Sequence, residues 1–277
     1  MVVIWNILIR KTVAVAVPNV EIGMTYGTVL GFGVCRETSD PKIVRIKFID
    51  SWDEMETINP PLSTGVWRPP LGNVPRKSIH FDACEGSVTI DGVVYWLATE
   101  RVMTHAGGNY YILIVSFDTT SEEFGEVYLP DSLAHLDDYN LSISKLRNRV
   151  VILEQHRDEK GYGVWMMQDG VSVASFFIDS FVRIFTINSP DASVKGFRKT
   201  GEPIIELVED GHRPLVVYDP YSTNVIFLEN DVDGSSFCAY PYVETLLLHD
   251  QPDFTIYDNG KATLSEERVR EAFEAYM

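Results

Sequence analysis

Six histidines and three cysteines are the side chains of this sequence best suited to bind a metal ion or act as nucleophiles. No two histidines stand at ligand spacing, and neither an HExxH nor a CxxC pattern occurs, although zinc sites need several ligands close together. Asp231-Val232-Asp233-Gly234 is similar to the start of a calcium loop but lacks the downstream bidentate Glu. We therefore expect neither a metal nor a cofactor. The histidines are His80, His105, His135, His156, His212 and His249.

Patterns of nucleophilic catalysis and of dinucleotide binding are equally absent. The sequence has no GxSxG motif, and Cys35 lies in a strand-like run rather than in an electropositive pocket. Gly31-Phe32-Gly33 lacks the third glycine and the following helix of a dinucleotide fingerprint. We expect a protein that is not an enzyme.

The formal net charge of −17, from 40 acidic and 23 basic residues, makes nucleic acid an unsuitable partner. The same charge would attract a basic protein partner, although it also serves solubility. No apolar run reaches the ~20 residues of a membrane span. Cys35, Cys84 and Cys238 lie far apart, which favours a reducing compartment, the cytoplasm or the nucleus.

A short unit recurs about every fifty residues, the period of propeller blades. Each copy is an apolar strand, an Asn or Asp, a polar turn and a second strand, centred on Asn6, Asp118 and Asp219; a fourth copy has Pro61 in the acidic position. The Asn or Asp side chain is expected to accept a main-chain N–H bond two residues further on. The return strand is expected to be anchored by an aromatic or β-branched residue, namely Trp67, Phe124 or Val225.

Further hairpins are predicted at Asp91-Gly92, near Asn148 and at Thr200-Gly201, because these residues favour tight turns. A helix is predicted at the C-terminus, where Thr263 and Glu266 have the spacing of a capping box. Four tryptophans lie within apolar strand runs and are expected in the core: Trp5, Trp67, Trp96 and Trp165.

Several strings in order give the chain a family resemblance. From Trp5 to about Asp250, the chain resembles the F-box-associated interaction domain of plant F-box proteins. The segments that carry the resemblance, in chain order, include WNILIRKTVAVAVPNV, STGVWRPPL, GVVYWLA, EVYLPDSLA and VVYDPYST. The resemblance implies an all-β, kelch-like β-propeller of about five to six blades, some incomplete, over residues 1–262. A helical tail is expected over residues 263–277.

The sequence departs from the family pattern at three places. Nothing upstream of Trp5 could be the F-box that docks onto a Skp1-type adaptor, and the strand usually found before Trp5 is missing. Asn6-Ile7 replaces the usual Asn-Pro. The two prolines of INPPL cannot serve a central strand.

The function implied by the resemblance is recognition of target proteins for a Skp1–cullin–F-box type ubiquitin ligase, with the adaptor bound only where an upstream F-box exists. The alternative is a free-standing β-propeller interaction module that is not coupled to ubiquitin transfer. A third hypothesis, an enzyme, needs carboxylates from distant blades to meet across the ring.

Loops are the expected place of target contacts, because they vary freely on a rigid scaffold. The acidic loops suit a basic partner surface, and a tryptophan flanked by charge could anchor an interface. Ordinary solvated loops are the alternative for each of them. The candidate partner-binding residues are Trp52, Asp137, Asp138, Tyr139, Asp231 and Asp233.

Overall fold

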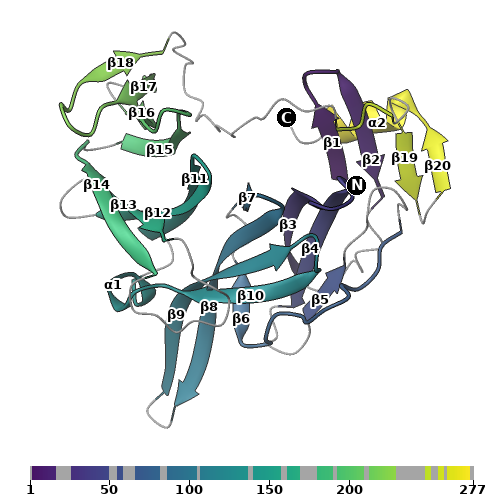
Figure 1. Ribbon diagram of the computed structural model, residues 1–277, viewed down its shortest axis with the longest axis horizontal. Coiled ribbons are helices and arrows are strands. Elements are labelled where there is room, and N and C mark those ends of the chain that lie inside the picture. Colours follow the sequence, from purple (N-terminus) through teal and green to yellow (C-terminus); the bar gives the residue numbers. More distant parts are fainter. Residues whose placement is uncertain are drawn as a thin grey trace.

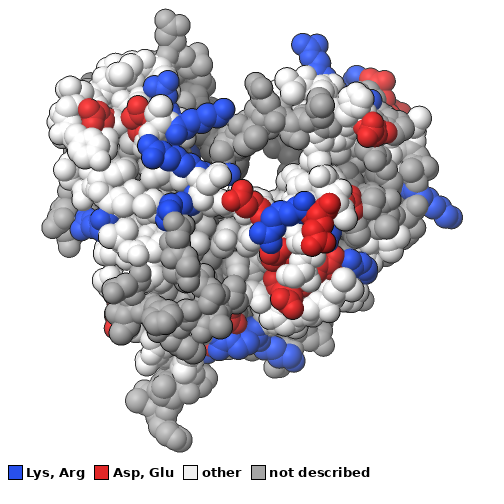
Figure 2. Space-filling model, in the orientation of Figure 1, with Lys and Arg blue, Asp and Glu red and all other residues white. Residues whose placement is uncertain are grey.

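The computed structural model groups its strands into five sheets around a central opening, which the space-filling view also shows (Figures 1 and 2). The described residues are 2–16, 26–49, 55–58, 66–81, 86–104, 107–136, 140–156, 161–168, 180–189, 192–208, 212–228, 247–250, 255–258 and 261–274.

The first sheet joins the two ends of the chain, in the order β1-β2-β19-β20. The pair β2–β19 is parallel, and the other two pairs are antiparallel. Helix α2 (Glu266–Glu274) follows the last strand. Sharing of one sheet by both chain ends is how a propeller removes its open sheet edges. The strands are β1 (Val2–Asn6), β2 (Lys11–Val15), β19 (Thr255–Asp258) and β20 (Lys261–Leu264).

The second and third sheets are antiparallel and lie next to each other along the chain. The second has the order β3-β4-β5, with β3 (Tyr26–Val34), β4 (Pro41–Ile49) and β5 (Met55–Ile58). The third has the order β10-β9-β8-β6, with β7 also paired to β8, and is followed by the short helix α1 (Asp131–Ala134). Its strands are β6 (Ile79–Phe81), β7 (Val88–Ile90), β8 (Val93–Thr104), β9 (Gly107–Asp118) and β10 (Glu123–Tyr128).

The fourth and fifth sheets are antiparallel meanders of four strands each. The fourth consists of β11 (Leu141–Leu146), β12 (Arg149–His156), β13 (Gly161–Met167) and β14 (Phe181–Ile187). The fifth consists of β15 (Ala192–Phe197), β16 (Pro203–Leu207), β17 (Leu215–Tyr218) and β18 (Val225–Phe227).

The architecture is all-β and propeller-like, as the sequence predicts, but the number of blades differs from the expectation. Four of the five sheets formed by the described residues have the four or more strands of a blade, and the sheet β3-β4-β5 has three. The structure therefore describes four blades instead of five to six. Of the segment INPPL, residues 59–62 lie outside the described residues.

Apolar side chains from facing sheets meet in separate clusters and hold neighbouring sheets together. Val44 and Ile46 of the second sheet pack with Trp96 of the third, and Ile205 of the fifth packs with Leu153 of the fourth. Trp96 is 2% exposed, and its Nε1 donates to the Leu30 carbonyl at 3.0 Å. This approach requires glycine on β3, because a Cβ at Gly31 would lie 2.3 Å from the Trp96 ring.

The repeated Asn or Asp closes its hairpin turn as the sequence predicts. Asn6 Oδ1 accepts the N–H of Leu8 at 3.1 Å, and Asp118 Oδ1 accepts the N–H of Thr120 at 2.7 Å. Asp219 Oδ1 accepts the N–H of Tyr221 at 2.9 Å. The side chain thus supplies the hydrogen bond that fixes the first half of each turn.

The second half of each turn ends in a residue with left-handed backbone, four positions after the Asn or Asp. These residues are Arg10, Glu122 and Thr223, with φ of 52°, 59° and 57°.

The β3–β4 turn has the same geometry, with Cys35 in the position of the Asn or Asp. Ser39, four positions after Cys35, has a φ of 57°. A hydrogen bond from Thr38 lowers the pKa of Cys35 to about 7, although burial opposes the shift.

The other predicted hairpins also form. Ile90 pairs with Val93 across Asp91 and Gly92, which have φ of 47° and 75°, as a type I′ turn requires. Leu146 pairs with Arg149 across the turn at Asn148.

Some local predictions are wrong. Trp5 was expected in the core but is 48% exposed, because it lies on β1 at the edge of the first sheet. Val225 was expected to anchor its return strand but is 38% exposed on the edge strand β18, whereas Phe124 is buried. Thr263 lies in β20, and the hydroxyl of Ser265 instead accepts the N–H of Arg268 at the start of α2.

The predicted core tryptophans otherwise differ in burial. Trp96 is buried, whereas Trp67 and Trp165 are half-buried. The Nε1 of Trp67 donates to the Ala16 carbonyl at 2.6 Å, and that of Trp165 donates to Glu154 at 2.8 Å. The indole N–H groups of Trp67 and Trp165 therefore both have an acceptor, although both rings are partly exposed to solvent.

A buried carboxylate, Glu122, connects three segments of the chain. It is 1% exposed, accepts a bond from Lys42 Nζ of β4 at 2.7 Å and accepts two bonds from Arg68 at 2.6 and 2.7 Å. The N–H of Leu71 donates to it at 3.2 Å. Burial raises the pKa of Glu122, but the hydrogen bonds from Arg68 and Lys42 outweigh burial and hold this pKa below its ordinary value. The ionised carboxylate fastens the second sheet and residues 66–72 to the β9–β10 turn.

Replacing Glu122 by Gln is expected to lower the free energy of unfolding by about 3 kcal/mol, because it leaves two cations without their buried counter-charge. The neighbouring Glu123 is exposed and supplies the matched control, Glu123→Gln. Urea unfolding followed by circular dichroism measures both variants. Equal unfolding free energies for the two variants would contradict this role.

The contribution of Glu122 should also depend on pH. Its folded-state pKa lies below the ordinary value of 4.5, so its stabilisation is complete above that value and is lost as pH falls below it. The difference in unfolding free energy between the wild type and Glu122→Gln is therefore expected to shrink from about pH 6 to about pH 3. A difference that grows on acidification would overturn the assignment.

Candidate functional site between the fourth and fifth sheets

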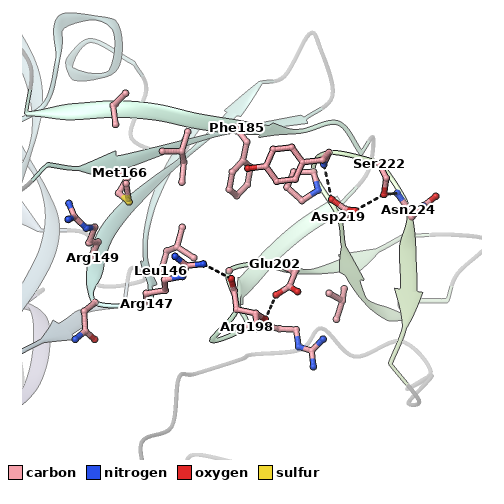
Figure 3. Close-up of a pocket in the computed structure, with 18 of the residues that line it drawn as sticks. Leu146, Arg147, Arg149, Met166, Phe185, Arg198, Glu202, Asp219, Ser222 and Asn224 are labelled. Carbon is pink, nitrogen blue, oxygen red and sulfur yellow. Dashed lines mark hydrogen bonds between the residues drawn. The ribbon is translucent and has the colours of Figure 1, made fainter.

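A pocket of about 1420 Å³ lies between the fourth and fifth sheets (Figure 3). Three hairpin turns form part of its wall: the β11–β12 turn at Arg147, the β15–β16 turn at Arg198–Glu202 and the β17–β18 turn at Asp219–Asn224. Apolar side chains of the strands line it between the turns: Leu146, Met166, Val182, Ile184, Phe185, Val217 and Ile226. We refer to this site as the arginine pocket.

Three arginines from two sheets give the pocket its name. Arg147 and Arg149 flank Asn148 in the fourth sheet, and Arg198 stands at the start of the β15–β16 turn in the fifth. Arg147 Nη2 donates to the Thr200 carbonyl at 2.8 Å, which joins the two turns across the sheet boundary. Figure 3 shows Arg147 and Arg198 on the same side of the pocket, with Arg149 and Met166 towards one end.

Two carboxylates also line the pocket, and both already serve their own turns. Asp219 accepts bonds from the Ser222 hydroxyl at 2.6 Å and from the Tyr221 N–H, and these bonds lower its pKa. Glu202 accepts a bond from the Thr200 hydroxyl, which lowers the pKa of Glu202. Both groups are therefore ionised at neutral pH, and each is held by a local donor.

The pocket differs in charge from the other arginine-rich parts of the molecule. Arg36, Arg68 and Arg76 form ion pairs with Asp118, Glu122 and Glu100, respectively. The ion pairs of the described residues include neither Arg147 nor Arg198. Figure 2 shows a group of basic side chains over the fourth and fifth sheets, although the chain as a whole carries −17 charges. The pocket thus suits an anionic ligand.

Chemically, the arginine pocket offers hydrogen-bond donors and an apolar surface. Its lining residues include no His, Cys or Lys, so they provide no nucleophile–base pair of the common kind. In the described part of the chain, no three His, Cys, Asp or Glu side chains gather as metal ligands. Separately, no helix within the described ranges is long and apolar enough to cross a membrane.

The residues predicted as partner contacts, Trp52, Asp137, Asp138, Tyr139, Asp231 and Asp233, all lie outside the described residues. Sequence reasoning missed the arginines of the pocket. A signal for two of them was present, because Arg147 lies next to the predicted turn at Asn148 and Arg198 lies just before the predicted turn at Thr200-Gly201. What the sequence did not reveal is that these two turns are neighbours in space.

Comparison with known proteins shows the family of the chain and its similarity to individual proteins. The model of the F-box associated beta propeller domain matches residues 1–230. A protein of Arabidopsis thaliana named "Putative F-box protein At3g10240" is 23% identical over 224 residues, which cover 79% of this chain and 53% of that protein. The chain thus spans about half the length of this curated relative.

Among solved structures, a hypothetical protein from Leishmania major is similar, with a TM-score of 0.36 and 11% identity. The similarity covers 77% of this chain and 70% of that one. A TM-score this low carries no argument about fold or function.

Asp219 is expected to control the order of the β17–β18 turn that lines the pocket. Asp219→Ala removes the acceptor for the N–H of Tyr221 and for the hydroxyl of Ser222, so amide hydrogen exchange of residues 219–224 should become faster. Asp219→Asn keeps a side-chain oxygen in place and is the matched control, for which slow exchange is expected. Equal exchange in the two variants would show that this side chain does not hold the turn.

Proposed function

Because the chain belongs to the family of F-box associated beta propeller domains, we propose that it is the part of an F-box protein that binds target proteins. The match of the family model over residues 1–230 carries this proposal. The propeller-like arrangement supports it, since a rigid set of sheets presents several turns side by side as a binding surface. The domain itself performs no catalysis in this proposal.

Membership of this family also leads us to propose the type and bounds of the propeller, its link to a ubiquitin ligase and its contacts to the target. The propeller is of the kelch type and comprises residues 1–262, with residues 263–277 as a helical tail. An F-box in the full product binds a Skp1-type adaptor and brings the target to a cullin-based ubiquitin ligase, in the cytoplasm or the nucleus. Asp137, Asp138, Asp231 and Asp233, with Trp52 and Tyr139, are proposed contacts to a basic surface of the target.

The second candidate function is an interaction module that binds its targets without delivering them to a ligase. The two candidates share the binding step and differ in whether ubiquitin transfer follows.

Affinity capture from plant cells is expected to separate the two candidates. The tagged chain should retain a reproducible set of proteins that the tag alone does not retain. The longer product of the same gene, where it carries an F-box, should retain the same proteins together with a Skp1-type adaptor. Quantification of ubiquitin remnants on the captured proteins should show an increase with the longer product.

Each outcome of the capture experiment decides between the proposals. Failure of the wild-type chain to retain any protein above the tag control would overturn target binding. Capture of targets with no adaptor, and with unchanged ubiquitin remnants, would assign the chain to the free-standing module. The F-box segment expressed without the propeller controls for proteins brought in by the adaptor.

A further inference from the structure

We infer that the arginine pocket binds a short anionic peptide segment that carries an apolar side chain. The inference rests on the proposed function, because it names the chemistry by which a target protein would be recognised. Anionic here means carboxylate or phosphate groups on a peptide, since an arginine fork binds either of them in a bidentate manner.

Arg147 and Arg198 provide the cationic part of the proposed binding site. Arg147 and Arg198 come from neighbouring turns of different sheets, and the Arg147 side chain donates to the Thr200 carbonyl in the turn that begins at Arg198. A guanidinium has five N–H donors, so this single bond leaves Arg147 able to bind a ligand. Arg198 is exposed in the same wall. Two cations held this way form a site for at least two anionic groups.

Both pocket carboxylates accept hydrogen bonds from their own turns, and the charge of Arg198 helps to lower the pKa of Glu202 without an ion pair between the two side chains. Asp219 faces its own turn, where the Tyr221 N–H and the Ser222 hydroxyl donate to it, and Glu202 accepts from the Thr200 hydroxyl (Figure 3). Neither carboxylate forms an ion pair with Arg147 or Arg198 in the described residues. The arginines are therefore not neutralised in the way that Glu122 neutralises Arg68.

The arginine pocket is large and has an apolar surface. At about 1420 Å³, it exceeds the ~300–1,000 Å³ of ordinary small-molecule sites, so it accommodates several residues of an extended peptide. Phe185, Met166 and Ile184 line the same pocket as the arginines. An apolar side chain of the peptide would bury its surface there while its anionic neighbours reach the turns.

Charge complementarity selects the occupant. The lining includes three arginines, of which Arg149 also donates to the Met167 carbonyl, and two carboxylates that accept bonds within their own turns, in a chain whose net charge is −17. A long nucleic acid would meet this net negative charge beyond the pocket, and three cations neutralise few phosphates. A short acidic segment contacts the local positive region alone. A peptide is therefore the occupant that these charges favour.

Fluorescence anisotropy with the full purified chain tests the inference. The main probe is a labelled peptide of about ten residues with Asp and Glu around one Leu. Matched probes replace the acids by Asn and Gln, replace the Leu by Gly, or replace two acids by phosphoserine. A single-stranded oligonucleotide is the fifth probe.

The variant pair is matched in charge. Arg147→Gln/Arg198→Gln removes two cations from the pocket, and Arg268→Gln/Arg270→Gln removes two exposed cations from α2. The pocket double variant is expected to bind the acidic Leu probe at least about tenfold more weakly than the wild type, because hydrogen bonds to charged groups are lost. The α2 double variant should bind within about twofold of the wild type, since exposed distant charges are screened by salt. Arg198→Gln alone, in an exposed turn that needs no repacking, should weaken binding about threefold or more.

The outcomes are decisive in each direction. Weaker binding of the uncharged probe and of the Gly probe supports both parts of the recognition, and a preference for the phosphoserine probe assigns the anion to phosphate. Equal binding of acidic and uncharged probes, or equal effects of the two double variants, would overturn the inference. Oligonucleotide binding as tight as that of the acidic peptide would overturn the peptide assignment.

The inference and the proposed function can fail separately. If cellular targets are still captured by Arg147→Gln/Arg198→Gln, the proposed function stands and the pocket is not where targets bind. If the wild-type chain captures no target but binds the acidic probe through Arg147 and Arg198, the pocket chemistry stands and the proposed function fails.

Discussion

Three hairpins of this protein depend on one repeated interaction, in which an Asn or Asp side-chain oxygen accepts the main-chain N–H two residues further on. The interaction holds the turns at Asn6, Asp118 and Asp219. It leaves the residue four positions later with a left-handed backbone, and at the β9–β10 turn this residue is Glu122. The same turn geometry thus serves two purposes: it places the buried carboxylate that joins the second and third sheets, and it forms one wall of the arginine pocket through Asp219.

Two boundaries between sheets differ in whether their basic side chains are paired with a carboxylate. Between the second and third sheets, Lys42 and Arg68 are neutralised by Glu122, so this boundary is a closed, ion-paired junction. Between the fourth and fifth sheets, Arg147 bonds to a main-chain carbonyl instead of a carboxylate, and the turns enclose a pocket. A buried ion pair connects the sheets it joins and is costly to break. A pocket with arginines at its wall remains able to bind an anionic ligand.

Sequence reasoning succeeded where the controlling interaction is local. The turn at Asp91-Gly92 and the side-chain acceptors at Asn6, Asp118 and Asp219 involve residues two to four positions apart, so their types predict the geometry. It failed where burial depends on the position of a strand in its sheet, as for the exposed Trp5 and Val225 on edge strands. It could not find the arginine pocket, because Arg147 and Arg198 are about fifty residues apart and meet through the packing of two sheets, which no local pattern encodes. The predicted number of blades was wrong for a related reason. Dividing the chain length by the repeat length gives only an average, whereas the pairing of strands decides how many strands each sheet contains.

We propose that targets bind at the arginine pocket, on the turns of the fourth and fifth sheets. Hydrogen exchange of the chain with a captured target bound, compared with the chain alone, tests this location. Slower exchange is expected in residues 146–149, 197–203 and 219–224 of the bound chain, which form the pocket turns. Slower exchange confined to other parts of the chain, for example to α1 at Asp131–Ala134, with the pocket turns unchanged, would contradict it.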